Sequence, residues 1–179
     1  MRLDVLEAAS RRAAAEFRKP LQQFTNSMAT NNPLGLRQLV LSGGDARQGR
    51  RLFAERADWG CQRCHKLDGE GGDVGPELKG IGRSKGRAYV LNAVLNPNAE
   101  IAQGFESVQL ELRSGESLLG ILKEETDTTL SIAIPGAGTE RIQKSNIASR
   151  QRGPSAMPDG LGELMTLSEL RDLIEALSE

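Results

Sequence analysis

The stretch Cys61-Gln62-Arg63-Cys64-His65 contains both cysteines and the one histidine of the 179-residue chain. One histidine cannot build a zinc or copper site that needs several, and two cysteines cannot hold an iron–sulfur cluster or a disulfide framework. The 23 Lys and Arg residues balance the 24 Asp and Glu residues, which argues against a dedicated nucleic-acid binder or a basic membrane-surface protein. Most metal chemistry is therefore excluded by composition alone.

The spacing C-x-x-C-H is the signature of covalent haem attachment. Two thiols three residues apart on one turn can add to the two vinyl groups of a haem, and the adjacent imidazole can bind the iron. A thioredoxin-like C-x-x-C would need a preceding strand and a long helix, whereas a helix is predicted before it and the glycine-rich segment 69–72 follows. A zinc site would have to take its fourth ligand from Asp or Glu. The sequence therefore predicts one haem c, attached through Cys61 and Cys64, with His65 binding the iron.

The second axial ligand of the iron cannot be a histidine, because the chain has no other. The thioether candidates are Met28, Met157 and Met165. Met157 lies in the segment 154–158 (PSAMP), whose flanking prolines limit the backbone freedom that ligand binding would remove. Met165 lies at an apolar helical step, where a core methionine is the better interpretation. Met157 is thus the expected ligand, and Met28, Met165 and an open iron are the alternatives.

Apolar residues at helical spacing predict helices in several parts of the chain. Asp45 is a good N-cap, and Thr166 with Glu169 forms a capping box. The predicted helices cover 3–24, 34–41, 46–56, 84–95 and the residues after Thr166, and 26–34 is predicted to be a linker.

From Phe105 onward the apolar period changes to two, which indicates strands. Turn residues near 114–115, 125–127 and 135–138 separate them. We expect a small antiparallel sheet or barrel of four or five strands, in which no residue carries chemistry. The predicted strands lie near 108–112, 118–122, 130–134, 141–142 and 148–151.

No continuous apolar stretch is long enough for a secretory signal or a transmembrane span. Haem attachment to C-x-x-C-H nevertheless takes place outside the cytoplasm. We therefore expect a periplasmic or otherwise extracytoplasmic protein whose sequence is a piece of a longer precursor.

The order of these features resembles a class I cytochrome c. An amphipathic helix with Gly49 and Phe53 precedes the C-x-x-C-H stretch, and Gly75-Pro76, Leu78, the Met157 loop and a last helix follow it. The resemblance implies a mainly α fold with helices around the haem. It also implies that the Pro76 carbonyl accepts the proximal histidine N–H, that Leu78 packs on the haem, and that Phe53 belongs to the haem site.

With its β insertion, the chain more closely resembles the planctomycete-type haem-binding module found at the C-terminus of large predicted dehydrogenases. The landmarks are the segments 43–46, 71–76, 96–97 and 155–158. This resemblance covers about 40–179. It implies an N-terminal helical extension and linker over 1–40 and a cytochrome c domain over 41–179, interrupted by the β insertion 104–151 before the Met157 loop. One departure is Ala176, where the terminal helix usually carries an aromatic residue.

These features predict an electron carrier rather than an enzyme. A haem bound by His65 and Met157 leaves no open iron position, so we expect outer-sphere electron transfer from a dehydrogenase domain or a partner protein. The alternative is a five-coordinate haem that acts as a peroxidase or gas sensor. No nucleic acid and no direct membrane span are expected, and the β insertion is our candidate docking surface for the redox partner.

Overall fold

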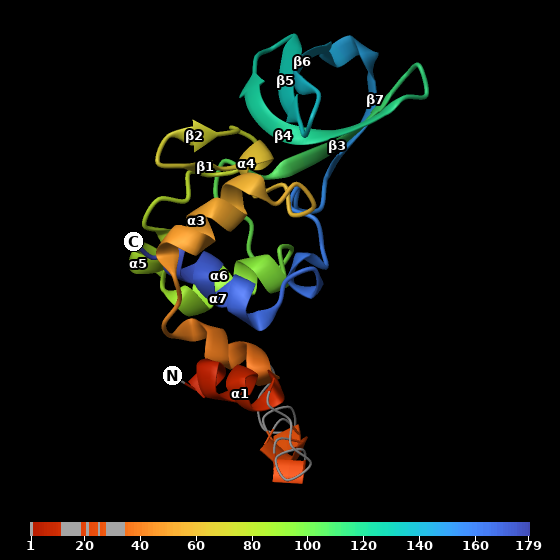
Figure 1. Ribbon diagram of the computed structural model, residues 1–179. Helices are drawn as coiled ribbons and strands as arrows, with labels where there is room; N and C mark the ends of the chain where they lie inside the picture. Colours follow the sequence, from red (N-terminus) through yellow and green to blue (C-terminus); the bar gives the residue numbers. More distant parts are fainter. Residues whose placement is uncertain (1, 12–18, 21, 25, 28–34) are drawn as a thin grey trace. The chain divides into compact units, whose positions relative to one another are not determined.

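The structure is a computed structural model that describes residues 2–11, 19–20, 22–24, 26–27 and 35–179 (Figure 1). Its contacts divide the chain into two compact units. Unit 1 consists of Met1–Glu55, Gly80–Leu91 and Gly162–Glu179, and unit 2 consists of Arg56–Lys79 and Asn92–Leu161. The described chain is mixed helix and strand rather than mainly α, because a five-stranded sheet accompanies the helices.

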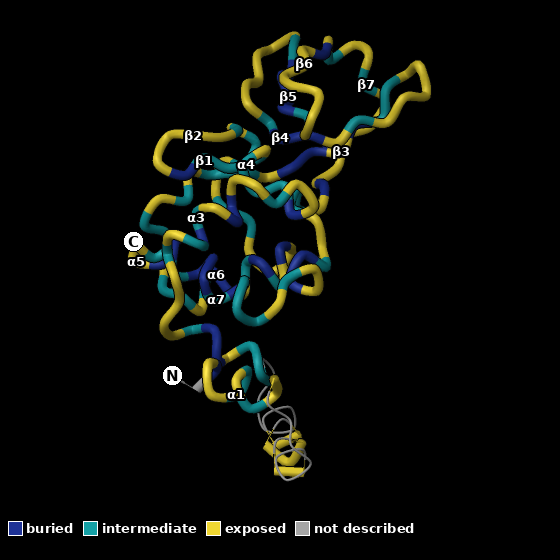
Figure 2. The backbone as a smooth tube through the Cα atoms, viewed as in Figure 1, coloured by how far each residue is buried: buried dark blue, intermediate teal, exposed yellow. Residues whose placement is uncertain are grey.

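Helices form most of unit 1. They are α1 (Arg2–Arg11), η1 (Gly35–Leu41, a 3-10 helix), α3 (Ala46–Glu55), α5 (Ile81–Lys85), the first part of α6 (Arg87–Leu95) and α7 (Leu167–Ala176). They contribute apolar residues that are almost completely buried: Leu3, Val40, Phe53, Leu91, Leu170, Leu173 and Ile174. Figure 2 colours the buried stretches of the backbone dark blue. Much of the predicted helix 3–24 and linker 26–34 lies outside the described residues, as does Met28.

Two predicted helix starts are confirmed. Asp45 caps α3, since the Gln48 amide donates to its Oδ1 at 3.0 Å. Thr166 and Glu169 form the capping box of α7. The single helix expected from Ser84 to about Leu95 is wrong: Gly86, at φ 93°, separates α5 from α6. A left-handed residue cannot continue a helix.

The crossing of α3 and α7 depends on a glycine. A Cβ at Gly49 would collide with the carbonyl of Asp172 and would lie 2.8 Å from the Cβ of Ala176. The Asp45 amide also donates to Asp172 Oδ1 at 2.9 Å. The small Ala176 side chain, where the resemblance implies an aromatic residue, is therefore matched by a very close approach of the two helices.

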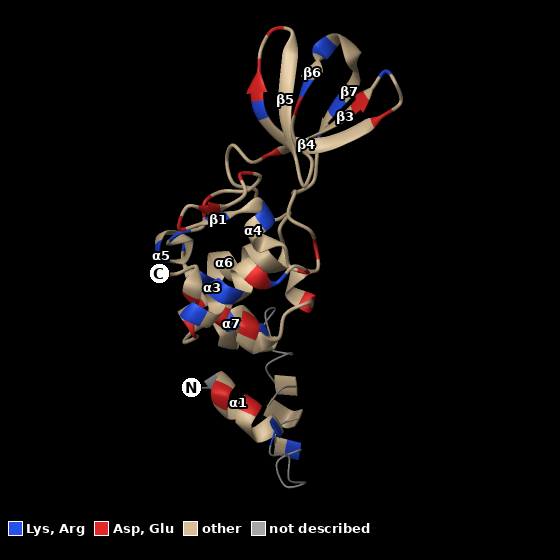
Figure 3. Ribbon diagram, turned by 45° about the horizontal axis from the view of Figure 1, so that its top comes forward, with Lys and Arg blue, Asp and Glu red and all other residues tan. Residues whose placement is uncertain are grey.

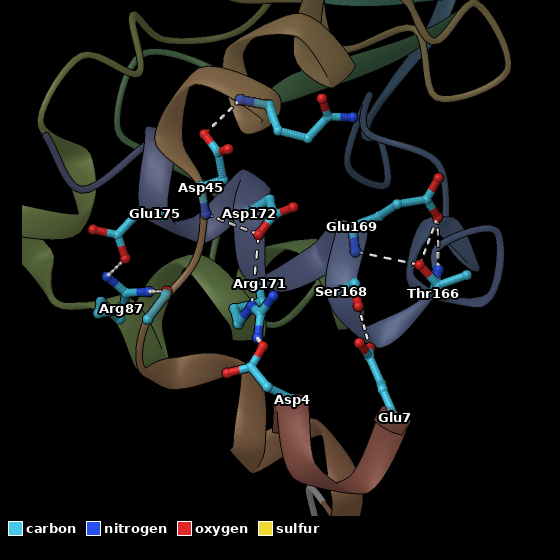
Figure 4. A network of polar contacts seen from close by, with 12 residues as sticks. Asp4, Glu7, Asp45, Arg87, Thr166, Ser168, Glu169, Arg171, Asp172 and Glu175 are labelled. Carbon is cyan, nitrogen blue, oxygen red and sulfur yellow. Dashed lines mark hydrogen bonds and ion pairs between the residues drawn. The ribbon is translucent and has the colours of Figure 1, made fainter. Parts of the chain in front are cut away.

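Polar contacts connect α7 to other parts of unit 1 (Figure 4). Arg171 pairs with Asp4 at 2.5 Å and lowers the pKa of that carboxyl group to about 2. Arg87 pairs with Glu175 at 2.7 Å and donates to the Gly43 carbonyl at 2.8 Å. These contacts attach α1, α6 and the turn before α3 to one helix.

Unit 2 contains the sheet that the alternating pattern predicts. Its strands run antiparallel in the order β6-β5-β4-β3-β7, so the last strand returns to pair with the first. Their bounds are β3 (Ser107–Leu112), β4 (Ser117–Glu125), β5 (Thr129–Ile134), β6 (Gly138–Gln143) and β7 (Ile147–Arg152), with the 3-10 turn η2 (Lys144–Asn146) between the last two. One face carries the apolar cluster Val108, Leu110, Leu130, Ile132 and Ile142.

The opposite face of the sheet is also covered along one row. Ser107 pairs with Ile121, which pairs with Ala133, so the three residues lie side by side on β3, β4 and β5. Their exposed fractions are only 1%, 1% and 6%. A sheet that faced water on this side would expose these positions, so the row lies against other parts of the fold.

The remaining elements of unit 2 are short. They are α4 (Cys61–Cys64) and the hairpin of β1 (Lys66–Leu67) and β2 (Glu70–Gly71). The hairpin, which was not predicted from the sequence, turns through Asp68 and Gly69, both at positive φ. η3 (Leu161–Glu163) leads toward α7.

Charged residues of both signs are interspersed along the described chain (Figure 3). Among the described helices, none has the length and apolar character needed to cross a membrane.

Candidate haem-binding site

The two cysteines lie on a single helical turn. Gly60, in the left-handed region at φ 65°, precedes α4, and the His65 amide donates to the Cys61 carbonyl at 2.9 Å. Both thiols are free and partly buried. Burial raises the pKa of Cys61 to about 11 and raises the pKa of Cys64 as well. The thiols are therefore neutral at pH 7, and neutral thioethers would suit the same surroundings.

The imidazole of His65 is oriented by a backbone carbonyl. Its Nδ1 lies 2.8 Å from the oxygen of Pro76, the contact that the resemblance predicts. A carbonyl can only accept, so the Nδ1–H donates and Nε2 keeps its lone pair. Burial lowers the pKa of His65, which further favours the neutral ring. The residue thus presents an unprotonated nitrogen suited to iron.

The segment 71–78, which we call the proximal strap, is bonded to the C-x-x-C-H stretch along its length. The Gly72 amide donates to the Gln62 carbonyl at 2.9 Å, and the Gly75 amide donates to the Cys64 carbonyl at 2.7 Å. The Leu78 amide donates to the Lys66 carbonyl at 2.9 Å. The position of His65 therefore depends on the strap.

Glycines let the strap approach this closely. A Cβ at Gly75 would collide with the His65 ring, and Cβ atoms at Gly71 and Gly72 would collide with the carbonyls of His65 and Arg63. From the sequence, these glycines were predicted to follow the C-x-x-C-H stretch and to be landmarks of the resemblance, but this steric role was not predicted. Their closeness to the C-x-x-C-H stretch was the available signal.

The segment 153–159, which we call the methionine loop, holds Met157 half-buried within the same unit. The Met157 amide donates to Ser155 Oγ at 3.1 Å, and the Ser155 amide donates to Asn98 Oδ1 at 2.7 Å. Asn98 Nδ2 donates to both carboxylate oxygens of Asp159 at 3.1 Å. Asn98, which was not among the predicted site residues, thus contacts the loop on both sides of Met157.

The structure distributes the predicted site residues over the two units. Unit 2 contains Cys61, Cys64, His65, Pro76, Leu78 and Met157, and of these Leu78 is half-buried. Phe53 is in unit 1, where it is only 2% exposed. Met165 also belongs to unit 1 and precedes α7.

The residues of unit 2 fit a haem. Two neutral thiols on one turn and a neutral imidazole with a free Nε2 are the groups that thioether formation and iron binding require. In addition, Trp59, two residues before Cys61, is only 4% exposed, and its Nε1–H has no acceptor within the described part of the chain. A buried donor without an acceptor marks a place that a bound group can complete.

Comparison with known proteins agrees with this geometry. Residues 46–111 match the family model described as Cytochrome c, a range that includes α3, α4 and the proximal strap. No curated protein matches the sequence significantly. The match supports a c-type cytochrome domain, and together with Cys61 and Cys64 it indicates one covalently bound haem c.

Proposed function

We propose that this chain is an electron-transfer cytochrome c module whose haem iron is bound by His65 and Met157. The observation that carries the proposal is the bond from His65 Nδ1 to the Pro76 carbonyl, directly beside the two cysteines. When bound, the haem supplies a one-electron couple between oxidised and reduced iron.

The residues of the chain have separate tasks in this function. Cys61 and Cys64 fix the haem covalently on one helical turn. Pro76 holds the His65 ring in the tautomer that binds iron and makes the ring more basic. The thioether of Met157 would be the second ligand of the iron and would raise the reduction potential relative to a second imidazole. With His65 and Met157 as its ligands, the iron would have no position left for a substrate, and the chemistry that the haem would supply is electron transfer.

A cytochrome c implies a redox partner. We propose that electrons come from a dehydrogenase, either an upstream domain of a longer protein or a separate chain, as in the planctomycete-type module. Because covalent haem attachment takes place outside the cytoplasm, we place the protein in the periplasm or another extracytoplasmic compartment. The balance of 23 basic and 24 acidic residues gives no reason to expect a nucleic-acid partner.

The methionine assignment can be tested by spectroscopy of the oxidised protein. Methionine ligation gives a weak near-infrared sulfur-to-iron charge-transfer band. We expect Met157→Ala to abolish this band and Met165→Ala, the control, to retain it. A high-spin wild-type spectrum would instead favour the five-coordinate peroxidase or sensor, and an intact band in Met157→Ala would contradict the assignment.

A further inference from the structure

We infer that the five-stranded sheet is a brace that holds the proximal strap and the methionine loop in place, with Lys123 and Ser107 as its two attachment points. The inference rests on the proposed function, because it gives these two positioning residues a role toward the ligands His65 and Met157. All four residues belong to unit 2.

The first attachment joins β4 to the proximal strap. Lys123 Nζ donates to the Asp73 carbonyl at 2.7 Å and lies 5.2 Å from the centre of the Phe105 ring. Asp73 follows Gly72 and lies two residues before Gly75, whose backbone packs on the His65 ring. Lys123 therefore binds the part of the strap that packs against the imidazole of His65.

The charge around Asp73 strengthens this attachment. The Asp73 carboxylate forms an ion pair and hydrogen bond with Lys66, which lowers its pKa, and Lys123 contributes in the same direction. The carboxylate thus stays charged near neutral pH and attracts both ammonium groups. One strap residue is held from the C-x-x-C-H side by Lys66 and from the sheet by Lys123.

The second attachment joins β3 to the methionine loop. The Ser107 hydroxyl donates to the Pro154 carbonyl, and the Gly153 amide donates to the Ser107 carbonyl at 3.0 Å. Ser107 is 1% exposed, and a Cβ at Gly153 would lie 2.5 Å from its Oγ. The loop therefore leaves the sheet through a close, buried contact three residues before Met157.

The two attachments lie near each other on adjacent strands. Ser107 pairs directly with Ile121, two residues before Lys123. The β4–β5 register shifts between Leu122 and Glu124, which places Lys123 at a bulge. Bulges redirect side chains, and ladder hydrogen bonds keep neighbouring strands at a fixed separation. The sheet can thus limit how far the two ligand loops move apart.

The second attachment, from β3 to the methionine loop, is tested with Ser107→Ala, and Ser117→Ala is the control. Ser117 also uses its hydroxyl within the sheet, toward Glu111, and contacts neither ligand loop in the described bonds. Added imidazole competes with Met157 for the oxidised iron. We expect Ser107→Ala to raise the apparent imidazole affinity about three- to tenfold, as loss of one hydrogen bond allows, while Ser117→Ala leaves it unchanged.

The first attachment, from β4 to the proximal strap, is tested with Lys123→Met, and Arg150→Gln is the matched control. Arg150 pairs with Glu125, so its substitution also removes one positive charge from the sheet. Hydrogen exchange of the haem-loaded protein is measured by peptide mass spectrometry. We expect Lys123→Met to speed exchange in 71–78 and not in 153–159, Ser107→Ala to do the reverse, and Arg150→Gln to change neither.

The inference is overturned if Lys123→Met and Ser107→Ala leave exchange in both segments and the imidazole affinity at wild-type values. It is also overturned if both variants speed exchange equally across the whole chain, which is the mark of general destabilisation. The exchange data are informative even if the wild-type protein lacks the near-infrared band. A missing band contradicts the proposed Met157 ligation, whereas unchanged exchange contradicts the brace.

The brace differs in its consequences from a sheet that serves only as a docking surface. Replacing 106–150 by a short linker would leave the near-infrared band intact if the sheet only docks a partner. The brace predicts that the band is lost, because both attachments are removed. The point variants decide the matter if the shortened chain does not fold.

Discussion

His65 must satisfy two requirements with one ring. Its Nδ1–H is held by the Pro76 carbonyl at 2.8 Å, and the proposed function requires that Nε2 stay unprotonated to bind iron. Because Gly75 has no side chain, the strap can pack directly against the imidazole ring without displacing it. The resemblance predicted the hydrogen bond, but the steric role of Gly75 required the path of the strap, which no local pattern encodes.

Gly75→Ala should disturb the site at its centre. The added Cβ would collide with the imidazole, so the ring or the strap must shift and the bond to Pro76 must weaken. We expect a stability loss of about 1–3 kcal/mol, typical of overpacking, and a higher reduction potential, because a less basic imidazole stabilises oxidised iron less. Chemical denaturation and a redox titration measure the two effects.

Gly69→Ala is the control for a glycine change in the same region. Gly69 has a positive φ of 85° but no atom within 4 Å of an added Cβ. Gly69→Ala should therefore lower the free energy of unfolding by about 1 kcal/mol through backbone strain and leave the reduction potential unchanged. A potential that moves equally in both variants would contradict a specific contact between Gly75 and His65.

At the scale of the elements, pattern strength decided which predictions succeeded. All five strands of the sheet were predicted, because alternation over 107–152 is a strong signal and the turns between them are polar or rich in glycine. The helix expected over 84–95 failed at Gly86, whose left-handed backbone ends α5. The β1–β2 hairpin was missed because strands of two residues have no measurable period.

The α3–α7 crossing gives a prediction that runs against what the resemblance implies for α7. The resemblance implies an aromatic residue at position 176, but Ala176 here faces Gly49 with no space between them. Ala176→Phe should therefore destabilise this protein by about 1–3 kcal/mol instead of restoring a favourable contact. Thermal unfolding of the haem-loaded variant measures the change.

A half-buried residue just beyond α7 provides the comparison for Ala176→Phe. Ser178, one residue beyond the C-cap of α7, donates to the Ile174 carbonyl, so Ser178→Ala reports the loss of one local hydrogen bond near the same end. We expect it to cost less than Ala176→Phe. An unfolding midpoint for Ala176→Phe at or above wild type would show that α3 and α7 can separate enough to admit the ring.

At the scale of the whole molecule, the chemical groups of the site were predicted from the sequence, whereas the contacts that hold them in place were not. Three scarce residues within five positions identified the haem attachment without reference to the fold. The contacts that hold the loops connect residues far apart in the chain: Lys123 with Asp73, Ser107 with Pro154, and Asn98 with Ser155. Such pairs depend on tertiary packing, so periodicity and turn residues cannot reveal them.

The low aromatic content, 3% of the residues, suggests that the haem itself supplies part of the core. A haem that covers roughly 500 Å² of apolar surface would contribute on the order of 10 kcal/mol, an upper estimate. A Cys61→Ala, Cys64→Ala double variant should therefore lose both its colour and much of its stability. We expect rapid hydrogen exchange over 45–100, whereas the sheet keeps its protection because its apolar cluster is formed by sheet residues within 108–147. A colourless variant with wild-type exchange over 45–100 would show that the helices of this region pack without the cofactor.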